Sequence, residues 1–311
     1  MAVSRIQLTQ DPGGVTLSRL VLGAWRLLNR PETSSTQAIA RVIETALEAG
    51  ITTFDHADIY GNYAVEERFG EALRQVPGAT QRLEIITKTG IKLKSGARPQ
   101  HRIKSYDLSA GHIRQSVESS LRALGVDTID VLLLHRPDWL ADPDEIAGEF
   151  VRLKDQGKCR AFGVSNFSVS QVECLQSRLP FALATNQIEL SPFHMAPLNN
   201  GLLDQCVTKR MAPMAWSPLG GGRLFDTSDE QARRLVPVMT DILSRRTNLP
   251  RAAAIDHVAH AWLLAHPARI IPVLGSANVE RIASARIAEA IQLTREEWYE
   301  IWRAAEGREV P

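Results

Sequence analysis

The sequence has few cysteines, no excess of charge of one sign and no long apolar run. The three cysteines, Cys159, Cys174 and Cys206, are too few and too scattered for a disulfide framework or a zinc cluster, and they indicate unreactive thiols in a reducing compartment. Lys and Arg total 36 and Asp and Glu total 35, so the basic excess of a nucleic-acid-binding domain is missing. No apolar run reaches the roughly 18 residues of a membrane-spanning helix.

The N-terminal segment also lacks the apolar stretch of a signal peptide, and we therefore expect a cytoplasmic protein. Its 311 residues, 44% hydrophobic and 23% charged, have the composition of an ordinary globular protein and exclude a disordered chain. This length buries a core without help from a metal or a disulfide. We see no linker, and the sequence predicts a single domain over residues 1–311.

Eight short apolar runs without polar alternation recur along the chain, which is typical of parallel strands covered on both faces. They lie at 19–23, 51–55, 83–87, 129–134, 161–164, 181–185, 211–216 and 269–274.

Helical patterns with start and stop signals separate these runs. Ser34 or Ser35 precedes an amphipathic stretch that ends at Gly50, and Ser109 precedes another that ends at Gly125. Eightfold alternation of strand and helix predicts a (β/α)8 TIM barrel, an α/β fold. Before the first barrel strand, a β-hairpin with its turn at 11–14 could close the bottom of the barrel.

In such a barrel the chemistry gathers where the strands end, so the polar residues at these ends are the candidates for a site. They include Asp55 and Tyr60 after the second strand, Lys88 at the end of the third and His135 after the fourth. A Lys ammonium lowers the pKa of a nearby Tyr hydroxyl, and a carboxylate holds that ammonium in place. With a neutral His to bind a substrate oxygen, this set suits proton donation to a carbonyl during hydride transfer.

At these residues the sequence resembles the aldo-keto reductase superfamily over about residues 6–307. The segments FDHADIYG, IITKTG and LLLHRPD resemble the family's catalytic motifs. The resemblance implies that Asp55, Tyr60, Lys88 and His135 are the catalytic four, and that the protein reduces aldehydes or ketones with NADPH, with Tyr60 as the general acid. The likeness is greatest to bacterial members of uncertain substrate.

The resemblance also implies a cofactor site. GVSNF and NQIEL resemble the segments that hold the nicotinamide carboxamide, Trp216 takes the place of the ring that stacks on the nicotinamide, and SPLGGGRL resembles the loop around the pyrophosphate. The implied cofactor-binding residues are Gly23, Ala24, Trp25, Ser165, Asn166, Gln187, Trp216, Ser217, Pro218, Leu219, Gly220, Gly221, Gly222, Arg223, Gly275, Ser276, Asn278 and Arg281.

The 2′-phosphate region departs from the family pattern. Gly275 stands where many members have Lys, and Ser284-Ala285 stand at the position of a Glu-Asn pair. Arg281 remains, and its planar guanidinium can form two parallel hydrogen bonds to phosphate oxygens. We therefore expect NADPH as the cofactor.

The sequence leaves the substrate pocket and several alternatives open. We expect Trp25, His56, Trp139 and Phe193 to line the pocket, and the short C-terminal segment after Leu293 predicts an open site with no long lid. The segment 92–104, rich in Lys and Arg, is either a solvated loop or part of the entrance.

Two other classes of function are weighed against a reductase. An NADPH-binding regulatory or sensor subunit with little turnover is the alternative that an intact tetrad does not exclude. A metal-dependent hydrolase lacks ligands, because His257 and His260 on one predicted helix have no third partner. We expect no metal, no nucleic-acid or membrane partner, and a monomer.

Overall fold

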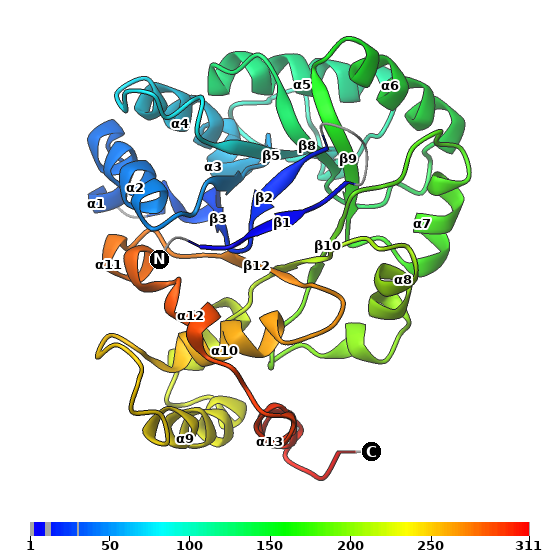
Figure 1. Cartoon of the computed structure of the whole chain (residues 1–311). Helices are drawn as coiled ribbons and strands as arrows, with labels where there is room; N and C mark the ends of the chain where they lie inside the picture. The colour runs from blue at the N-terminus through cyan, green and yellow to red at the C-terminus, as the bar shows by residue number, and fades with distance from the viewer. Residues whose placement is uncertain (1–2, 10–13, 30, 311) are drawn as a thin grey trace.

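The protein is a closed barrel of eight parallel strands surrounded by helices (Figure 1). The computed structural model describes residues 3–9, 14–29 and 31–310. Around the barrel the strands follow the order β10-β11-β12-β3-β4-β5-β8-β9. Their bounds are β3 Val21–Gly23, β4 Thr53–Asp55, β5 Glu84–Thr89, β8 Ile129–Leu134, β9 Cys159–Ser165, β10 Asn186–Glu189, β11 Met214–Trp216 and β12 Ile271–Leu274. The predicted (β/α)8 fold is confirmed.

The predicted helix caps explain where the long outer helices begin. Ser35 accepts a hydrogen bond from the Ala38 amide at the start of α2, and Ser109 caps α5 in the same way. The outer helices are α2 (Thr36–Glu48), α4 (Val65–Leu73), α5 (Ala110–Leu124), α6 (Pro143–Asp155), α7 (Val169–Gln176), α8 (Leu202–Thr208), α9 (Glu230–Ser244), α10 (Ile255–Leu264) and α11 (Val279–Ser284). The shorter or additional helices are η1 (Ala24–Arg26), α1 (Pro31–Ser34), α3 (Tyr60–Tyr63), η2 (Ala196–Leu198), η3 (Gly220–Phe225), α12 (Ile287–Ala290) and α13 (Arg295–Glu306).

The N-terminal hairpin crosses one end of the barrel (Figure 1). Strands β1 (Arg5–Gln7) and β2 (Thr16–Ser18) pair antiparallel, and the predicted turn at 11–14 lies mostly outside the described residues. Ile6 and Leu17 are buried together with side chains from inside the barrel, among them Ile86 and Met214. The hairpin therefore packs into the barrel core, as the sequence predicts.

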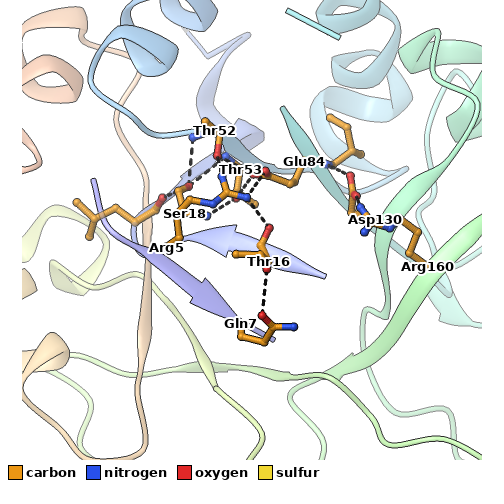
Figure 2. Close-up of polar contacts among 11 residues, drawn as sticks. Arg5, Gln7, Thr16, Ser18, Thr52, Thr53, Glu84, Asp130 and Arg160 are labelled. Carbon is orange, nitrogen blue, oxygen red and sulfur yellow. Dashed lines mark hydrogen bonds and ion pairs between the residues drawn. The ribbon is translucent and has the colours of Figure 1, made fainter. Parts of the chain in front are cut away.

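Polar contacts tie this hairpin to the beginnings of the barrel strands (Figure 2). Glu84, at the start of β5, accepts hydrogen bonds from Arg5 (2.6 Å), Thr52 (2.7 Å) and Thr53 (2.8 Å). Ser18 in β2 accepts from the amides of Thr52 and Thr53. This end of the barrel is thus closed by a network centred on one carboxylate.

The sixth strand was predicted at 181–185 and this prediction is wrong, because β10 begins at Asn186. Only Ala184 and Thr185, directly before β10, bond to the neighbouring strand β9, and the backbone of Phe181 and Leu183 bonds to a side chain. The Gln176 amide donates to the Phe181 carbonyl and its oxygen accepts from the Leu183 amide, both at 2.8 Å. The segment is therefore held against α7 until the chain enters the barrel.

Two further short strands shape the segment after β5. Strands β6 (Ile91–Lys92) and β7 (Ser105–Tyr106) pair antiparallel, so the segment 92–104 comprises the end of β6 and the connection of a small hairpin. Within it, the Arg98 guanidinium lies 4.5 Å from the centre of the Tyr63 ring.

Among the described residues, no helix has both the length and the apolar character to cross a bilayer.

Candidate active site

The carboxyl ends of the strands surround a cavity of about 890 Å³. Asp55 ends β4, Lys88 lies in β5, His135 follows β8 and Tyr60 begins α3. Asp55, Tyr60 and His135 line this cavity, while Lys88 lies beneath them and is 1% exposed. The structure therefore brings the four predicted catalytic side chains together.

The Lys88 ammonium connects the other members of this group. Its Nζ lies 2.8 and 2.7 Å from the two Asp55 carboxylate oxygens, 2.8 Å from the His56 carbonyl and 3.0 Å from the Tyr60 hydroxyl. Asp55 also accepts a 2.9 Å hydrogen bond from the Gln187 side chain of β10. Asp55 is therefore held by side chains from two other strands, β5 and β10, which limits the movement of the ammonium.

Burial and charge act in opposite directions on the two central groups. Burial raises the pKa of Tyr60, and the nearby Lys88 charge opposes this rise. Burial by itself would lower the pKa of Lys88, but the Asp55 charge and the contact with Tyr60 outweigh it, so its pKa is raised. Lys88 therefore stays an ammonium and Tyr60 a protonated hydroxyl at neutral pH.

His135 is a neutral imidazole in this site. Burial, together with the positive charges of Lys88 and Arg136, holds its pKa well below the usual value. The centre of its ring lies 5.9 Å from that of Tyr60, with the two rings nearly perpendicular. One side of the cavity thus presents a hydroxyl and a neutral imidazole next to each other.

On the opposite strands, four predicted residues form one hydrogen-bonded group. Trp216 donates from its indole to Asn166 (3.0 Å), the Asn166 amide donates to Ser165 (2.8 Å), and Ser165 donates to the Gln187 carbonyl (2.9 Å). Asn166 has a φ of 61°, a left-handed conformation that Asn tolerates better than most residues. All four side chains line the cavity.

The cavity continues from Trp216 along the segment before α9. Gly221 and Gly222 line it with φ of 70° and 111°, and a Cβ at either position would meet no other atom within 4 Å. At its far end lie Ser276, Asn278 and Arg281, with the Arg281 guanidinium 4.7 Å from the centre of the Phe225 ring. A long groove therefore joins Tyr60 to Arg281.

Comparisons with known proteins agree with this arrangement. The sequence profile of the aldo/keto reductase family matches residues 19–306. The chain belongs to the aldo/keto reductase family. It is 45% identical to the uncharacterized oxidoreductase YcsN of Bacillus subtilis (strain 168) over 309 residues, which cover 99% of this chain and 100% of that protein.

Two further comparisons support this assignment. The 6-dehydroglucose reductase of Agrobacterium fabrum (strain C58) is 43% identical over 94% of this chain and 96% of its own. The thermostable aldo-keto reductase Tm1743, solved with the inhibitor epalrestat, superposes with a TM-score of 0.79 at 25% identity, covering 97% of this chain and 100% of that one. Family membership implies carbonyl reduction that depends on NADH or NADPH.

Several predicted pocket residues of this aldo/keto reductase lie elsewhere. His56 was predicted in the substrate wall, but it is fully buried and its ring lies 4.4 Å from that of Phe69 in α4, away from the cavity. Trp139 is 77% exposed and packs near Tyr106, and Phe193 packs under the Arg223 guanidinium; neither lines the cavity. Trp25 does line it, 4.9 Å from the Tyr60 ring.

Three predicted cofactor residues also do not line the cavity. Ala24 is 1% exposed in the core beside α2. Arg223 forms an ion pair with Asp229 at 2.7 Å, and Gly220 lies against the Phe193 side chain.

The structure adds lining residues that were not among the predicted site residues. They are Arg26, Asn29, Glu32, Thr33, Arg136, Phe225, Asp256, Val273, Leu274, Ala277, Ile282, Ala285 and, one turn after Asp256, His260. His260 appeared in the sequence only as half of a poor metal motif on an outer helix. Its inward position follows from the packing of α10, which periodicity did not reveal. Within the described residues, no group of three His, Cys, Asp or Glu could hold a metal ion.

Proposed function

We propose that this protein reduces aldehydes or ketones to alcohols with NADPH, and that Tyr60 is the general acid. The observation that carries the proposal is the Lys88 ammonium, which contacts both Asp55 and the Tyr60 hydroxyl inside one buried group. The ammonium stabilises the phenolate that remains after proton transfer, and so opposes the rise that burial causes in the pKa of this hydroxyl.

The groove fits a nicotinamide dinucleotide, which when bound supplies a hydride. Asn166 and Gln187 would hold the carboxamide, and the Trp216 ring would lie along the nicotinamide. The open space beside Gly221 and Gly222 suits a pyrophosphate, because no side chain fills it. The exposed Arg281 would pair with a 2′-phosphate, which favours NADPH over NADH.

The residues around the carbonyl then have distinct tasks. Neutral His135 donates a hydrogen bond to the carbonyl oxygen and orients it. Tyr60 gives its proton to the same oxygen as negative charge develops there. Lys88 stabilises the phenolate, and Asp55 holds Lys88 in place. Trp25, which is 55% exposed, forms one wall of the substrate entrance.

Replacement of Tyr60 by Phe tests this assignment. We expect Tyr60→Phe to bind NADPH like the wild type and to lose carbonyl reduction by about 10²–10⁴-fold. A panel of aldehydes and ketones that includes 6-dehydroglucose, the compound for which the Agrobacterium relative is named, serves as substrates. Tyr299→Phe, on α13 outside the cavity, is the matched control and should keep full activity.

Two results would contradict the proposal. Full reduction by Tyr60→Phe would remove Tyr60 from the chemistry. Tight NADPH binding by the wild type with negligible turnover over the whole panel would favour the regulatory or sensor alternative.

A further inference from the structure

We propose that the carbonyl substrate carries an anionic group, a carboxylate or a phosphate, and that Arg136 binds it; this inference rests on the proposed carbonyl reduction at Tyr60. Arg136 comes two residues after the end of β8, next to His135, and both side chains line the cavity. The residue that orients the carbonyl oxygen and the residue that binds the anion are then neighbours in the chain. Arg136 selects and positions the substrate and takes no part in the proton transfer.

The guanidinium of Arg136 has no counter-ion in the protein. The residue is half-buried, and no carboxylate among the described residues forms an ion pair with it. Its guanidinium lies 5.9 Å from the centre of the ring of Trp216, another lining residue. The nearest acidic residue in sequence, Asp138, instead accepts hydrogen bonds from the amides of Leu108 and Leu140, at 3.0 Å each. Charges that leave water are usually paired in proteins, and an anion in the cavity can supply the missing partner.

The connection between β6 and β7 adds positive charge. The segment 91–106 contains no Asp or Glu and five basic residues, which are Lys92, Lys94, Arg98, Arg102 and Lys104. Among the described residues, Lys92 alone of these five pairs with a carboxylate, that of Asp107 at 3.2 Å. Most of this charge is therefore free to act on a ligand.

This hairpin lies beside the loop that carries Arg136. The amide of Leu108, just after β7, donates to the Asp138 carboxylate of that loop. The ring of Tyr106 in β7 lies 6.0 Å from that of Trp139. Lys104 directly precedes β7, so its charge is brought to the same side of the mouth as Arg136.

The result is a positive field at the place of the carbonyl. Burial is the largest cause of the lowered pKa of His135, and three positive charges add to it. Lys88 is one of these charges and is paired with Asp55. The other two, Arg136 and Lys104, have no carboxylate partner among the described residues. Such a field raises the local concentration of an anionic substrate.

The dinucleotide does not account for Arg136. The open space proposed for the pyrophosphate lies beside Gly221 and Gly222, where Arg26 donates to the Gly221 carbonyl at 2.9 Å. The 2′-phosphate is assigned to Arg281, at the other end of the groove. The nicotinamide ring that transfers the hydride has no negatively charged group. Arg136 is therefore left for the substrate.

The test compares pairs of aldehydes that differ in their anionic group. Succinic semialdehyde is compared with its methyl ester, and glyceraldehyde 3-phosphate with glyceraldehyde, so that a carboxylate and a phosphate are tested separately. kcat/KM is measured at saturating NADPH. We expect the wild type to favour the anionic member of at least one pair by about 10-fold or more. Arg136→Gln should lower kcat/KM for that member by about 10–100-fold, the loss of a charged hydrogen-bonding partner, and leave the neutral member nearly unchanged.

Three further variants define the contact. Arg136→Lys keeps the charge but loses the planar guanidinium, and should restore only part of the preference. Lys104→Gln removes an exposed charge and should lower the preference by about 2–5-fold, an effect that disappears at high salt. Arg122→Gln, at an exposed Arg of α5 outside the cavity, is the matched control and should behave like the wild type.

The outcomes separate this inference from the proposed function. Equal kcat/KM for both members of each pair in the wild type overturns the inference and leaves the proposed function intact. An Arg136→Gln variant that loses anionic and neutral substrates alike, or that binds NADPH more weakly, also overturns it. If Arg136→Gln does not fold, an undiminished preference in Arg136→Lys overturns it. A wild type that binds NADPH and reduces no aldehyde overturns the proposed function instead.

Discussion

Lys88 shows how a single charged residue can be kept inside a barrel. Its three ammonium hydrogens face four acceptor atoms, two on Asp55 and one each on His56 and Tyr60. Burial of an unpaired charge would be strongly unfavourable, and here the carboxylate and the extra oxygens offset that cost. The same contacts hold the ammonium at the Tyr60 hydroxyl, so stability and the proposed chemistry depend on one group of atoms.

The buried carboxyl of Asp58, two residues before Tyr60, should make the free energy of unfolding depend on pH. Its carboxyl accepts a hydrogen bond from Ser116 at 2.8 Å, but its other oxygen is buried without a partner. Burial raises its pKa to about 8. From pH ~4, the pKa of an unfolded Asp, up to about 8, the folded protein keeps a proton that the unfolded chain has lost. The free energy of unfolding therefore falls through this window, by at most about 1.4 kcal/mol per pH unit.

Asp58→Asn should remove this contribution, because Asn has nearly the shape of the protonated carboxyl and does not ionise. We expect the variant to gain stability over the wild type as the pH rises from 5 to 8, measured by urea unfolding. Asp155→Asn, at the exposed end of α6, should show no such trend. A constant difference between Asp58→Asn and the wild type over this range would contradict the raised pKa.

At this scale the sequence predicted the charged centre but not all of its neighbours. Asp55, Lys88 and His135 were found because barrel strands place their carboxyl ends around one mouth. His56 was misplaced because the turn after β4 directs its ring onto Phe69, and the spacing of motifs does not define that direction. His260 was not predicted, because its distinguishing feature is that its buried ring nitrogens have no hydrogen-bond partner. Only the packed structure shows this.

At the scale of elements, the N-terminal hairpin serves to close the barrel. Leu17 of β2 is fully buried within the barrel core, and Arg5 of β1 reaches Glu84 at the start of β5 (Figure 2). The hairpin thus joins an apolar contact inside the barrel with a polar network at its rim. Both lie at the end of the strands away from the cavity.

Leu17→Ala should destabilise the protein without affecting its groove. Removal of a fully buried Leu side chain costs about 2–5 kcal/mol, measured by urea unfolding. The dissociation constant of NADPH should stay at the wild-type value, since Leu17 does not line the cavity. Leu140→Ala, at a Leu that is 95% exposed, should change the free energy of unfolding by less than about 0.5 kcal/mol. A weaker NADPH affinity in folded Leu17→Ala would show that the hairpin shapes the site.

Element boundaries were predictable where local chemistry sets them. Ser109 caps α5 and Gly125 ends it with a φ of 70°, and both signals are local. The start of β10 was not predictable in this way, because Gln176 bonds the backbone at 181–183 from another element. An apolar run shows that a segment is buried, and its hydrogen-bond partners decide whether it is a strand.

At the scale of the whole molecule, the two ends of the barrel have separate tasks. The hairpin and the Glu84 network lie at the beginnings of the strands, and Tyr60, His135 and the groove lie at their carboxyl ends. Substitutions at the hairpin end should change the free energy of unfolding, and substitutions at the cavity end should change binding and catalysis. The groove also runs across several elements, so a bound nucleotide connects parts of the chain that are distant in sequence.

A ligand that spans these elements should stabilise the folded protein as a whole. NADPH at 100 times its dissociation constant adds about 2.7 kcal/mol, which raises Tm by about 5 °C in a protein of this size. Arg281→Ala should leave Tm without nucleotide unchanged, since Arg281 is exposed, and should reduce the shift with NADPH. NADH should give a smaller shift than NADPH in the wild type and the same shift in both proteins, because it has no 2′-phosphate.

Arg295→Ala, another exposed Arg but on α13, is the control and should keep the full NADPH shift. Equal shifts with NADPH and NADH in the wild type would remove the 2′-phosphate from recognition. A full NADPH shift in Arg281→Ala, with NADH still weaker, would assign the phosphate to other residues of the groove, of which Ser276 and Asn278 are the nearest polar ones in sequence.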